Sequence, residues 1–91
     1  MSALGMIETK GLVGLIVAAD ACVKAAKVEI LSRAKIGSAL TTIFVRGDVA
    51  SCQNACEAGA KAASQIGELV AVHVIPQPDT QLKDHWSEII E

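Results

Sequence analysis

Aromatic residues and positive charge are both scarce in this chain. Aromatics make up 2% of its 91 residues, with one Trp, one Phe and no Tyr, and eight Lys and Arg face ten Asp and Glu. Proteins that bind nucleic acid usually carry a basic excess, which neutralises phosphates, and those that bind single strands stack bases on aromatic rings. The composition therefore argues against a nucleic-acid-binding protein.

Long apolar runs are missing as well. The longest runs from Leu12 to Ala19, is interrupted by Gly14 and ends before Asp20. A membrane-spanning helix needs about 20 predominantly apolar residues. The first residues also lack the basic segment and apolar stretch of a secretory signal peptide. We therefore expect no membrane partner and no secretory leader.

The cysteines do not form a recognisable pair. Cys22, Cys52 and Cys56 are an odd number and contain no CxxC motif. This usage fits a reduced, cytoplasmic setting in which thiols act as small core residues. Cys52 and Cys56 lie one helical turn apart and could share a metal with a histidine, but without a further matching pair core packing is favoured. We expect no metal and no cofactor.

Catalytic motifs are also absent from the sequence. It contains no Ser-His-Asp arrangement, no paired carboxylates, no P-loop and no Gly-rich strand-to-helix turn. His73 alternates with Val72 and Val74 as in a strand, which favours a structural residue over a general base. We expect no enzyme activity; an enzyme subunit acting through Cys52, Cys56 and His73 is the least favoured alternative.

The chain is instead rich in small and branched apolar residues, which make up most of its 52% hydrophobic content. A disordered segment would be poor in such residues. A domain of this size buries only about 60–65% of the surface that its unfolded chain exposes. The apolar residues in excess of one small core then need a subunit interface. We therefore predict one domain, residues 1–91, that forms an obligate oligomer.

The spacing of apolar residues predicts the element order β-α-β-β-α-β. This order is typical of the α+β, ferredoxin-like fold, in which two helices cover one face of an antiparallel sheet. A hairpin-like connection is expected over residues 32–39, and a short C-terminal helix over about 80–90. The expected strands cover 3–9, 28–31, 40–46 and 69–75, and the expected helices cover 12–26 and about 49–66.

Each predicted helix has a face expected to be buried. The second begins after Asp48, an expected N-cap, and the tail helix is expected to pack its Trp86 stripe on its own subunit. A stripe of small residues on the first helix is expected to meet a second element or subunit. The apolar face of the first helix comprises Leu12, Leu15, Ile16, Ala19, Cys22, Val23 and Ala26; its small stripe comprises Gly14, Ala18, Ala21 and Ala25; and the second helix is expected to bury Val49, Cys52, Cys56, Ala63 and Ile66.

Two local features stand out, and the first has two interpretations. The segment Lys35-Ile36-Gly37-Ser38-Ala39 reads as an ordinary hairpin tip, or as a loop that offers small residues and backbone amides to a narrow opening on a symmetry axis. Lys24, near the end of the first helix, reads as a cation that complements the helix dipole. The residues alone leave these alternatives open.

Five segments in series resemble the bacterial microcompartment shell proteins of the small, single-domain, hexamer-forming class. The resemblance extends over about residues 3–78 and is closest to the propanediol- and ethanolamine-type metabolosome shell proteins. The segments are ALGMIETKGL at 3–12, AADA and VKAA within 18–26, KIGS at 35–38, VRGDV at 45–49 and VHVIP at 72–76.

The resemblance implies a function. Such proteins form flat cyclic hexamers that tile, with other shell proteins, into the facets of a shell around metabolic enzymes. A pore for small polar metabolites on the six-fold axis would be lined by Gly37, Ser38 and Ala39 and flanked by Lys35 and Ile36. The edge between neighbouring hexamers would contain Lys24 and Gln77. This places the protein in a microcompartment shell within the cytoplasm.

The chain departs from the family pattern at a few positions. Ala39 stands where glycine is usual, so an added methyl group is expected to narrow or stiffen the opening. Gln77 replaces an arginine and Asp79 a histidine, which implies a weaker or differently partnered edge. Leu40 follows where carboxysome relatives often carry arginine, which favours a catabolic compartment. The alternative function is a small regulatory or ligand-binding oligomer of the same fold.

Overall fold

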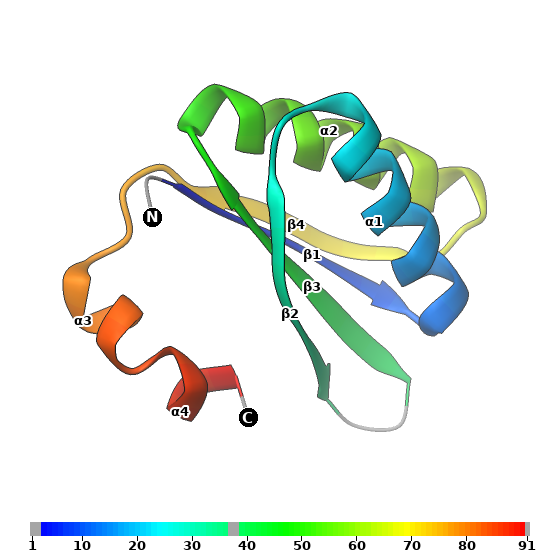
Figure 1. The fold of residues 1–91 in the computed structure, drawn as a ribbon. Coiled ribbons are helices and arrows are strands. Elements are labelled where there is room, and N and C mark those ends of the chain that lie inside the picture. Colours follow the sequence, from blue (N-terminus) through cyan, green and yellow to red (C-terminus); the bar gives the residue numbers. More distant parts are fainter. Residues whose placement is uncertain (1–2, 37–38, 91) are drawn as a thin grey trace.

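An antiparallel sheet with the strand order β2-β3-β1-β4 is the base of the fold. The computed structural model describes residues 3–36 and 39–90 (Figure 1). Two helices cover one face of the sheet, which confirms the predicted α+β, ferredoxin-like class. The elements are β1 (Ala3–Lys10), α1 (Leu12–Ala25), β2 (Glu29–Ile36), β3 (Leu40–Gly47), α2 (Val49–Gln65), β4 (Leu69–Ile75), α3 (Thr80–Asp84) and α4 (Trp86–Ile90).

Local sequence explains where the elements begin and end. Asp48 caps α2 as predicted, since its carboxylate accepts a hydrogen bond from the Ser51 backbone N–H at 2.8 Å. The hydrogen bonds that the Ser51 backbone N–H and hydroxyl donate to this carboxylate lower the pKa of Asp48. After α2, Gly67 takes a positive φ of 77°, a conformation that glycine adopts without strain, and the chain turns into β4. The β-branched run in β3 suits a strand that is paired on both sides.

The α1 and α2 helices approach each other through small residues. An ideal Cβ built on Gly59 of α2 would lie 2.6 Å from Cys22 Sγ and Ile7 Cδ1 and 3.0 Å from the Ala18 carbonyl oxygen. Because Gly59 has no side chain, Cys22 of α1 can fill the space beside it. The main core lies between this helix pair and the sheet; its buried members are Ile7, Leu15, Ala18, Cys22, Ile43, Val45, Ala55, Cys56 and Ala63.

This close approach corrects the predicted face of α1. Leu15 and Cys22 are buried, but Leu12, Ile16 and Val23 are exposed. Ala18 and Cys22 lie next to Gly59 of α2, where only small residues permit so short a separation, and the larger side chains are rotated outward. The predicted small stripe as a whole does not face α2, because Gly14 packs against Thr9 and Glu68 and Ala25 is exposed.

The predicted burial of α2 is also wrong at its two ends. Val49 and Ile66 are exposed, because they lie at the first and last turns of the helix, beyond the part that packs on α1 and the sheet. Cys52, Cys56 and Ala63, in the intervening turns, are buried as predicted.

Two predicted boundaries differ from the structure. The segment expected to connect the middle strands is mostly strand, because β2 continues to Ile36 and pairs with β3 as far as Leu40. The expected tail helix is divided at His85, which ends α3, since Trp86 turns back to the sheet. The Trp86 ring packs edge-on against Phe44 of the same chain, as predicted, with ring centroids 4.9 Å apart.

Replacement of Gly59 tests the helix contact. We expect Gly59→Ala to lower the free energy of unfolding by about 1–2 kcal/mol, because overpacking outweighs the higher helix propensity of alanine. Urea denaturation followed by circular dichroism measures the change. Glu57→Ala, at an exposed position of α2, is the control and should shift stability by no more than about 0.5 kcal/mol. Equal stability of Gly59→Ala and the wild type would contradict the close contact.

Candidate functional site

The hairpin between β2 and β3 contains the predicted pore segment. The backbones of Lys35 and Ile36 belong to β2 and face Thr41 and Leu40 across the hairpin. Gly37 and Ser38 lie outside the described residues. Ala39 is a half-buried turn residue that precedes β3. Because β2 ends at Ile36 and β3 begins at Leu40, the connection between the two strands comprises residues 37–39, the predicted pore residues.

Backbone hydrogen bonds hold the base of this turn. The Gly11 N–H donates to the Ala39 carbonyl oxygen at 2.7 Å, and the Lys10 N–H donates to the Glu68 carbonyl oxygen at 2.9 Å. Gly11 has a φ of 91°, which favours glycine at this junction of β1 and α1. The β1–α1, β2–β3 and α2–β4 connections therefore meet at one end of the sheet.

Two threonines add to the same end. Thr41 Oγ1 donates to the Ala34 carbonyl oxygen at 3.3 Å across the hairpin, and Thr9 Oγ1 donates to the Gly11 carbonyl oxygen at 3.1 Å. Both threonines are buried, so these bonds satisfy hydroxyls that would otherwise lack partners. Together with the backbone hydrogen bonds, these bonds brace this end of the sheet.

The predicted edge residues lie at the opposite end of the sheet. Because α1 runs back along the sheet after β1 ends, Lys24 in its last turn lies toward the start of β1. Gln77 follows β4, whose last residue, Ile75, pairs with Leu4 near the start of β1. Lys24 Nζ contacts Asp20 Oδ2 at 2.7 Å, with both side chains exposed, and Gln77 is exposed. The structure therefore separates the predicted pore and edge residues along the length of the strands.

An ion pair near the edge residues was not predicted from the sequence. Arg46 Nε donates to Glu29 Oε1 at 2.6 Å, and an Arg46 Nη2 contact completes the pair between β3 and β2. The two residues are 17 positions apart, and their register depends on a shift in pairing between Ile30 and Ser32. Only the sheet register could have revealed this pair.

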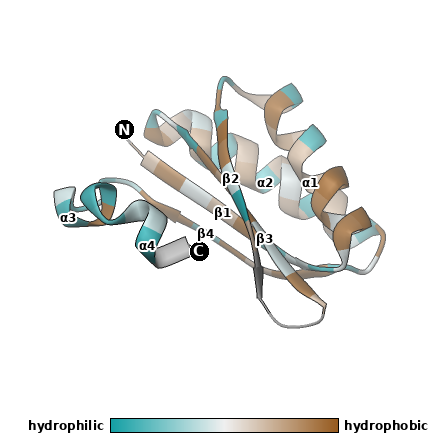
Figure 2. Ribbon diagram, turned by 60° about the horizontal axis from the view of Figure 1, so that its bottom comes forward, coloured by the Kyte–Doolittle hydropathy of each residue, from teal (hydrophilic) through white to brown (hydrophobic). Residues whose placement is uncertain are grey.

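Large apolar side chains are exposed on two sides of the molecule. Helix α1 contacts β1, β3 and β2, whereas α2 contacts β1, β4 and β3, so α1 and β4 lie toward opposite edges of the sheet. Figure 2 shows strongly hydrophobic turns on α1. We define the α1 flank as Leu12, Val13, Ile16 and Val23, and the β4 flank as Ile66, Val70 and Val72; their exposed fractions range from 42% to 70%. Exposed apolar surface of this kind is typical of interaction sites.

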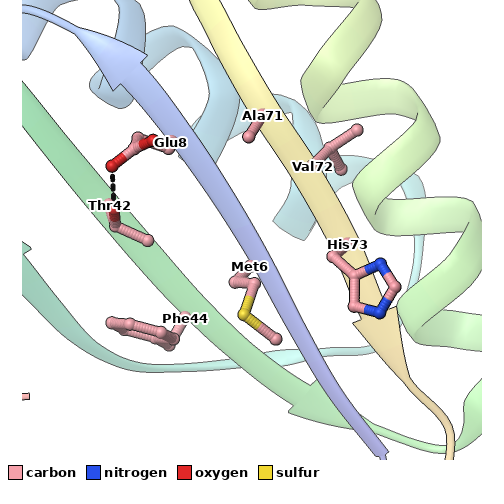
Figure 3. Close-up of a pocket in the computed structure, with 7 residues that line it drawn as sticks. All are labelled: Met6, Glu8, Thr42, Phe44, Ala71, Val72 and His73. Carbon is pink, nitrogen blue, oxygen red and sulfur yellow. Dashed lines mark hydrogen bonds between the residues drawn. The ribbon is translucent and has the colours of Figure 1, made fainter. Parts of the chain in front are cut away.

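The face of the sheet opposite α1 and α2 contains a hollow of about 260 Å³. In Figure 3, Glu8 points toward Thr42, and Met6 lies between Phe44 and His73. Thr42 Oγ1 and Glu8 Oε2 are 3.5 Å apart. The lining residues are Met6, Glu8, Thr42, Phe44, Ala71, Val72 and His73.

The structure does not assemble the alternative catalytic set. His73 is exposed and pairs with Met6, whose side chain lines the hollow on the open face. Cys56 lies on the other side of the sheet, where its Sγ would be 2.5 Å from a Cβ added to Gly5. Cys52 is also buried. His73 and these cysteines are thus separated by the sheet itself.

The buried thiols are poor nucleophiles and poor metal ligands. Burial raises the pKa of Cys22 to about 12 and that of Cys56 to about 11, and the neighbouring thiols add to both shifts. The thiolate is the reactive and metal-binding form, so both groups stay protonated at neutral pH. Within residues 3–36 and 39–90, the structure contains no group of three His, Cys, Asp or Glu side chains that could hold a metal ion.

The thiol pKa values predict a loss of stability at alkaline pH. Unfolding returns each thiol to a pKa near 9, so the folded state binds these protons more tightly. The resulting stabilisation is complete below pH 9 and is lost as pH rises through 11–12. We expect a loss of roughly 1 kcal/mol per thiol between about pH 8 and about pH 10.

Urea midpoints at these two pH values measure this effect. Cys56→Ala should show a smaller fall than the wild type, whatever its own stability at pH 8. An identical fall in the variant would show that other groups cause the pH dependence.

None of the helices described by the structure has the length and apolar content needed to cross a membrane.

Comparison with known proteins places the described geometry in context. A family model described as the BMC domain matches residues 3–78. The chain is 60% identical over 84 residues to the bacterial microcompartment shell protein EutM of Salmonella typhimurium. The aligned region covers 92% of this chain and 88% of that protein. The chain is also 56% identical over 81 residues to the bacterial microcompartment shell protein PduA of Citrobacter freundii. This aligned region covers 89% of this chain and 87% of PduA.

A solved structure has the same fold. The crystal structure of a microcompartment protein from Desulfitobacterium hafniense superimposes with a TM-score of 0.84 at 39% sequence identity. The match covers 92% of this chain and 48% of the other, so this chain spans about half the length of that protein.

Proposed function

Because this chain belongs to the BMC-domain family and is a structural shell protein of the metabolosome type, we propose that it acts as a tile: six copies close into a ring, and rings join into the facets of a microcompartment shell. The observation that carries the proposal is the match of the shell-protein family across the whole β1–β4 body. The Cα atoms extend 35 × 29 × 15 Å, and a slab of this shape suits a flat layer. In this proposal residues 1–91 form one domain, with its body over 3–78.

The two apolar flanks support a ring in particular. The α1 flank and the β4 flank contain different residues and lie toward opposite edges of the sheet. A contact between unlike surfaces is head-to-tail, and such contacts generate a closed ring when the rotation between subunits closes. Pairing of these flanks would bury the large apolar side chains that the single chain leaves exposed. The ring therefore accounts for the apolar excess of the sequence.

The braced hairpin end would face the centre of the ring. Gly37, Ser38 and Ala39 would line the pore, with Lys35 and Ile36 beside it. Six serine hydroxyls and nearby backbone amides make a polar, uncharged constriction that passes small polar metabolites and excludes bulky apolar ones. The hydrogen bond from Gly11 to Ala39 supports a rim with a fixed position.

The opposite end of the slab would form the outer rim. There Lys24 and Gln77 would contact neighbouring hexamers, including those of other shell proteins, around encapsulated enzymes. The contact of Asp20 with Lys24 supports an oriented ammonium group at this edge. The role requires no catalytic step by the chain, and the protonated state of its buried thiols agrees with a protein that is not an enzyme.

The edge role predicts a selective loss of large assemblies. We expect Lys24→Ala to retain a particle of six subunits but to form few or no extended sheets, because the ammonium group is missing from the contact between rings. Native mass spectrometry measures the first property, and electron microscopy of overexpressed protein measures the second. Lys83→Ala removes the same charge from an exposed position of α3 and should still form sheets. Normal sheets from Lys24→Ala would remove Lys24 from the rim, and a monomeric or dimeric wild type would refute the ring.

The pore role predicts that a bulky residue blocks transport. We expect Ser38→Trp to slow the passage of a small polar metabolite across purified shells at least several-fold, because six indole rings would fill the opening. Ser87→Trp adds the same bulk to an exposed position of α4 and should leave passage unchanged. Unchanged flux in intact Ser38→Trp shells would contradict a pore at this loop.

A further inference from the structure

The C-terminal segment reaches back across the open face of the sheet. Helices α3 and α4 lie on the side of the sheet away from α1 and α2 (Figure 1). Trp86 packs against Phe44 with an angle of 85° between the rings, an edge-to-face arrangement that aromatic pairs prefer. Phe44 also lines the hollow beside this contact (Figure 3). One ring is therefore shared by the tail contact and the hollow.

Part of the open face is closely covered. Side chains alternate along β1, so Leu4 shares this face with Met6 and Glu8. Leu4 is only 1% exposed, whereas His73 on the same face is exposed. Pro78, where the chain leaves β4, is buried. Figure 1 shows α3 and α4 on this side of the sheet, where Leu4 is buried while the hollow beside Phe44 stays open.

The helical part of the tail has little else to hold it. No residue of α3 is buried, and each of the two helices has five residues, far fewer than the about 12–15 that an isolated helix needs. The contact between His85 Nδ1 and Glu88 Oε1, at 2.9 Å, joins two tail residues to each other and not to the sheet. Trp86 is half-buried and is the tail side chain with an aromatic partner on the sheet.

A buried hydroxyl lies on the same face, on the residue that pairs with Phe44. Ser32 pairs directly with Phe44, so both side chains point to the open face. Ser32 Oγ is buried and has no hydrogen-bond partner within the part of the chain that the structure describes. A buried polar atom without a partner destabilises the state that buries it.

We propose that α3 and α4 form a strap that opens locally while the sheet stays folded, with Trp86 as its latch. Opening exposes Leu4 and the side of Phe44 that the indole ring covers, and so extends the hollow into a larger apolar surface. The Phe44 ring belongs to both the hollow and the contact with Trp86. A group that enters the hollow and displaces this ring therefore weakens the Trp86 contact. By reciprocity, release of Trp86 raises the affinity of the hollow for that group by the same factor. The strap is a property of the single subunit and does not depend on the ring or the pore.

Hydrogen–deuterium exchange of the intact protein is the first test. We expect backbone amides of residues 81–88 to exchange at least about 100-fold faster than those of β1 and β3, because local opening requires less free energy than global unfolding. Exchange of the tail at the same rate as the central strands would overturn the proposal. This measurement needs no variant and is independent of any effect of mutation on folding.

Tryptic cleavage after Lys83 tests the latch. Cleavage inside α3 requires the strap to be open, so its rate follows the open population. We expect Trp86→Ala to raise the rate about tenfold or more, while Trp86→Phe, which keeps an aromatic edge for Phe44, stays within about threefold of the wild type. The circular dichroism spectrum, and the number of subunits found by native mass spectrometry, should be the same for all three proteins. Equal cleavage rates in Trp86→Ala and the wild type would overturn the role of Trp86.

An uncharged apolar dye tests what opening exposes. We expect Nile red to bind Trp86→Ala with several-fold higher fluorescence than the wild type. Ala71→Trp, which fills the hollow from β4, should abolish that gain in the double variant. Dye binding that is equal in Trp86→Ala and the wild type, or a gain that survives Ala71→Trp, would show that the strap does not control this surface.

Discussion

The close contact between α1 and α2 determines most of what the molecule presents to its surroundings. Cys22 fits against Gly59, where any Cβ would collide with a sulfur, a methyl group and a backbone oxygen. Gly59 of α2 and Ala18 and Cys22 of α1 make this separation possible, and Ala18 and Cys22 occupy the inner side of α1. Its larger side chains, including Val13 and Ile16, are consequently exposed. The same contact that completes the core thus creates the α1 flank, which we propose as one half of the subunit interface.

The sheet separates the proposed functions in space. At one end, backbone hydrogen bonds from Gly11 and Lys10 join three connections under the loop that we propose as pore lining. At the other end, Lys24 and the Glu29–Arg46 pair present charge to the surroundings. Across the thickness of the sheet, protonated thiols lie beneath the helices and the hollow lies on the open face. A flat subunit whose proposed pore and edge lie at opposite ends of the sheet is well suited to a tile.

Sequence periodicity predicted the element order, and short-range chemistry predicted the cap at Asp48, because both depend on residues that are close in sequence. Sequence periodicity did not predict which face of α1 is buried, and a stripe of large residues on this helix is exposed. Burial is decided instead by which face the partner helix can approach. The periodicity also ended β2 too early, since Lys35 and Ile36 are held in the strand by pairing with β3. Of the candidate site, the exposure of Lys24 agrees with the sequence, whereas the Glu29–Arg46 pair depends on a register that no local pattern contains.

The amino-acid sequence by itself determined the α+β order, because that is a property of period, and the resemblance to the family, because that is carried by its motifs. The residues proposed for a pore or an edge follow from that resemblance alone. Only the tertiary structure decided which apolar side chains remain exposed, that His73 and the cysteines lie on opposite sides of the sheet, and that Trp86 meets Phe44. These are contacts between residues distant in the chain, and their formation depends on sheet register and helix separation, which no single segment specifies.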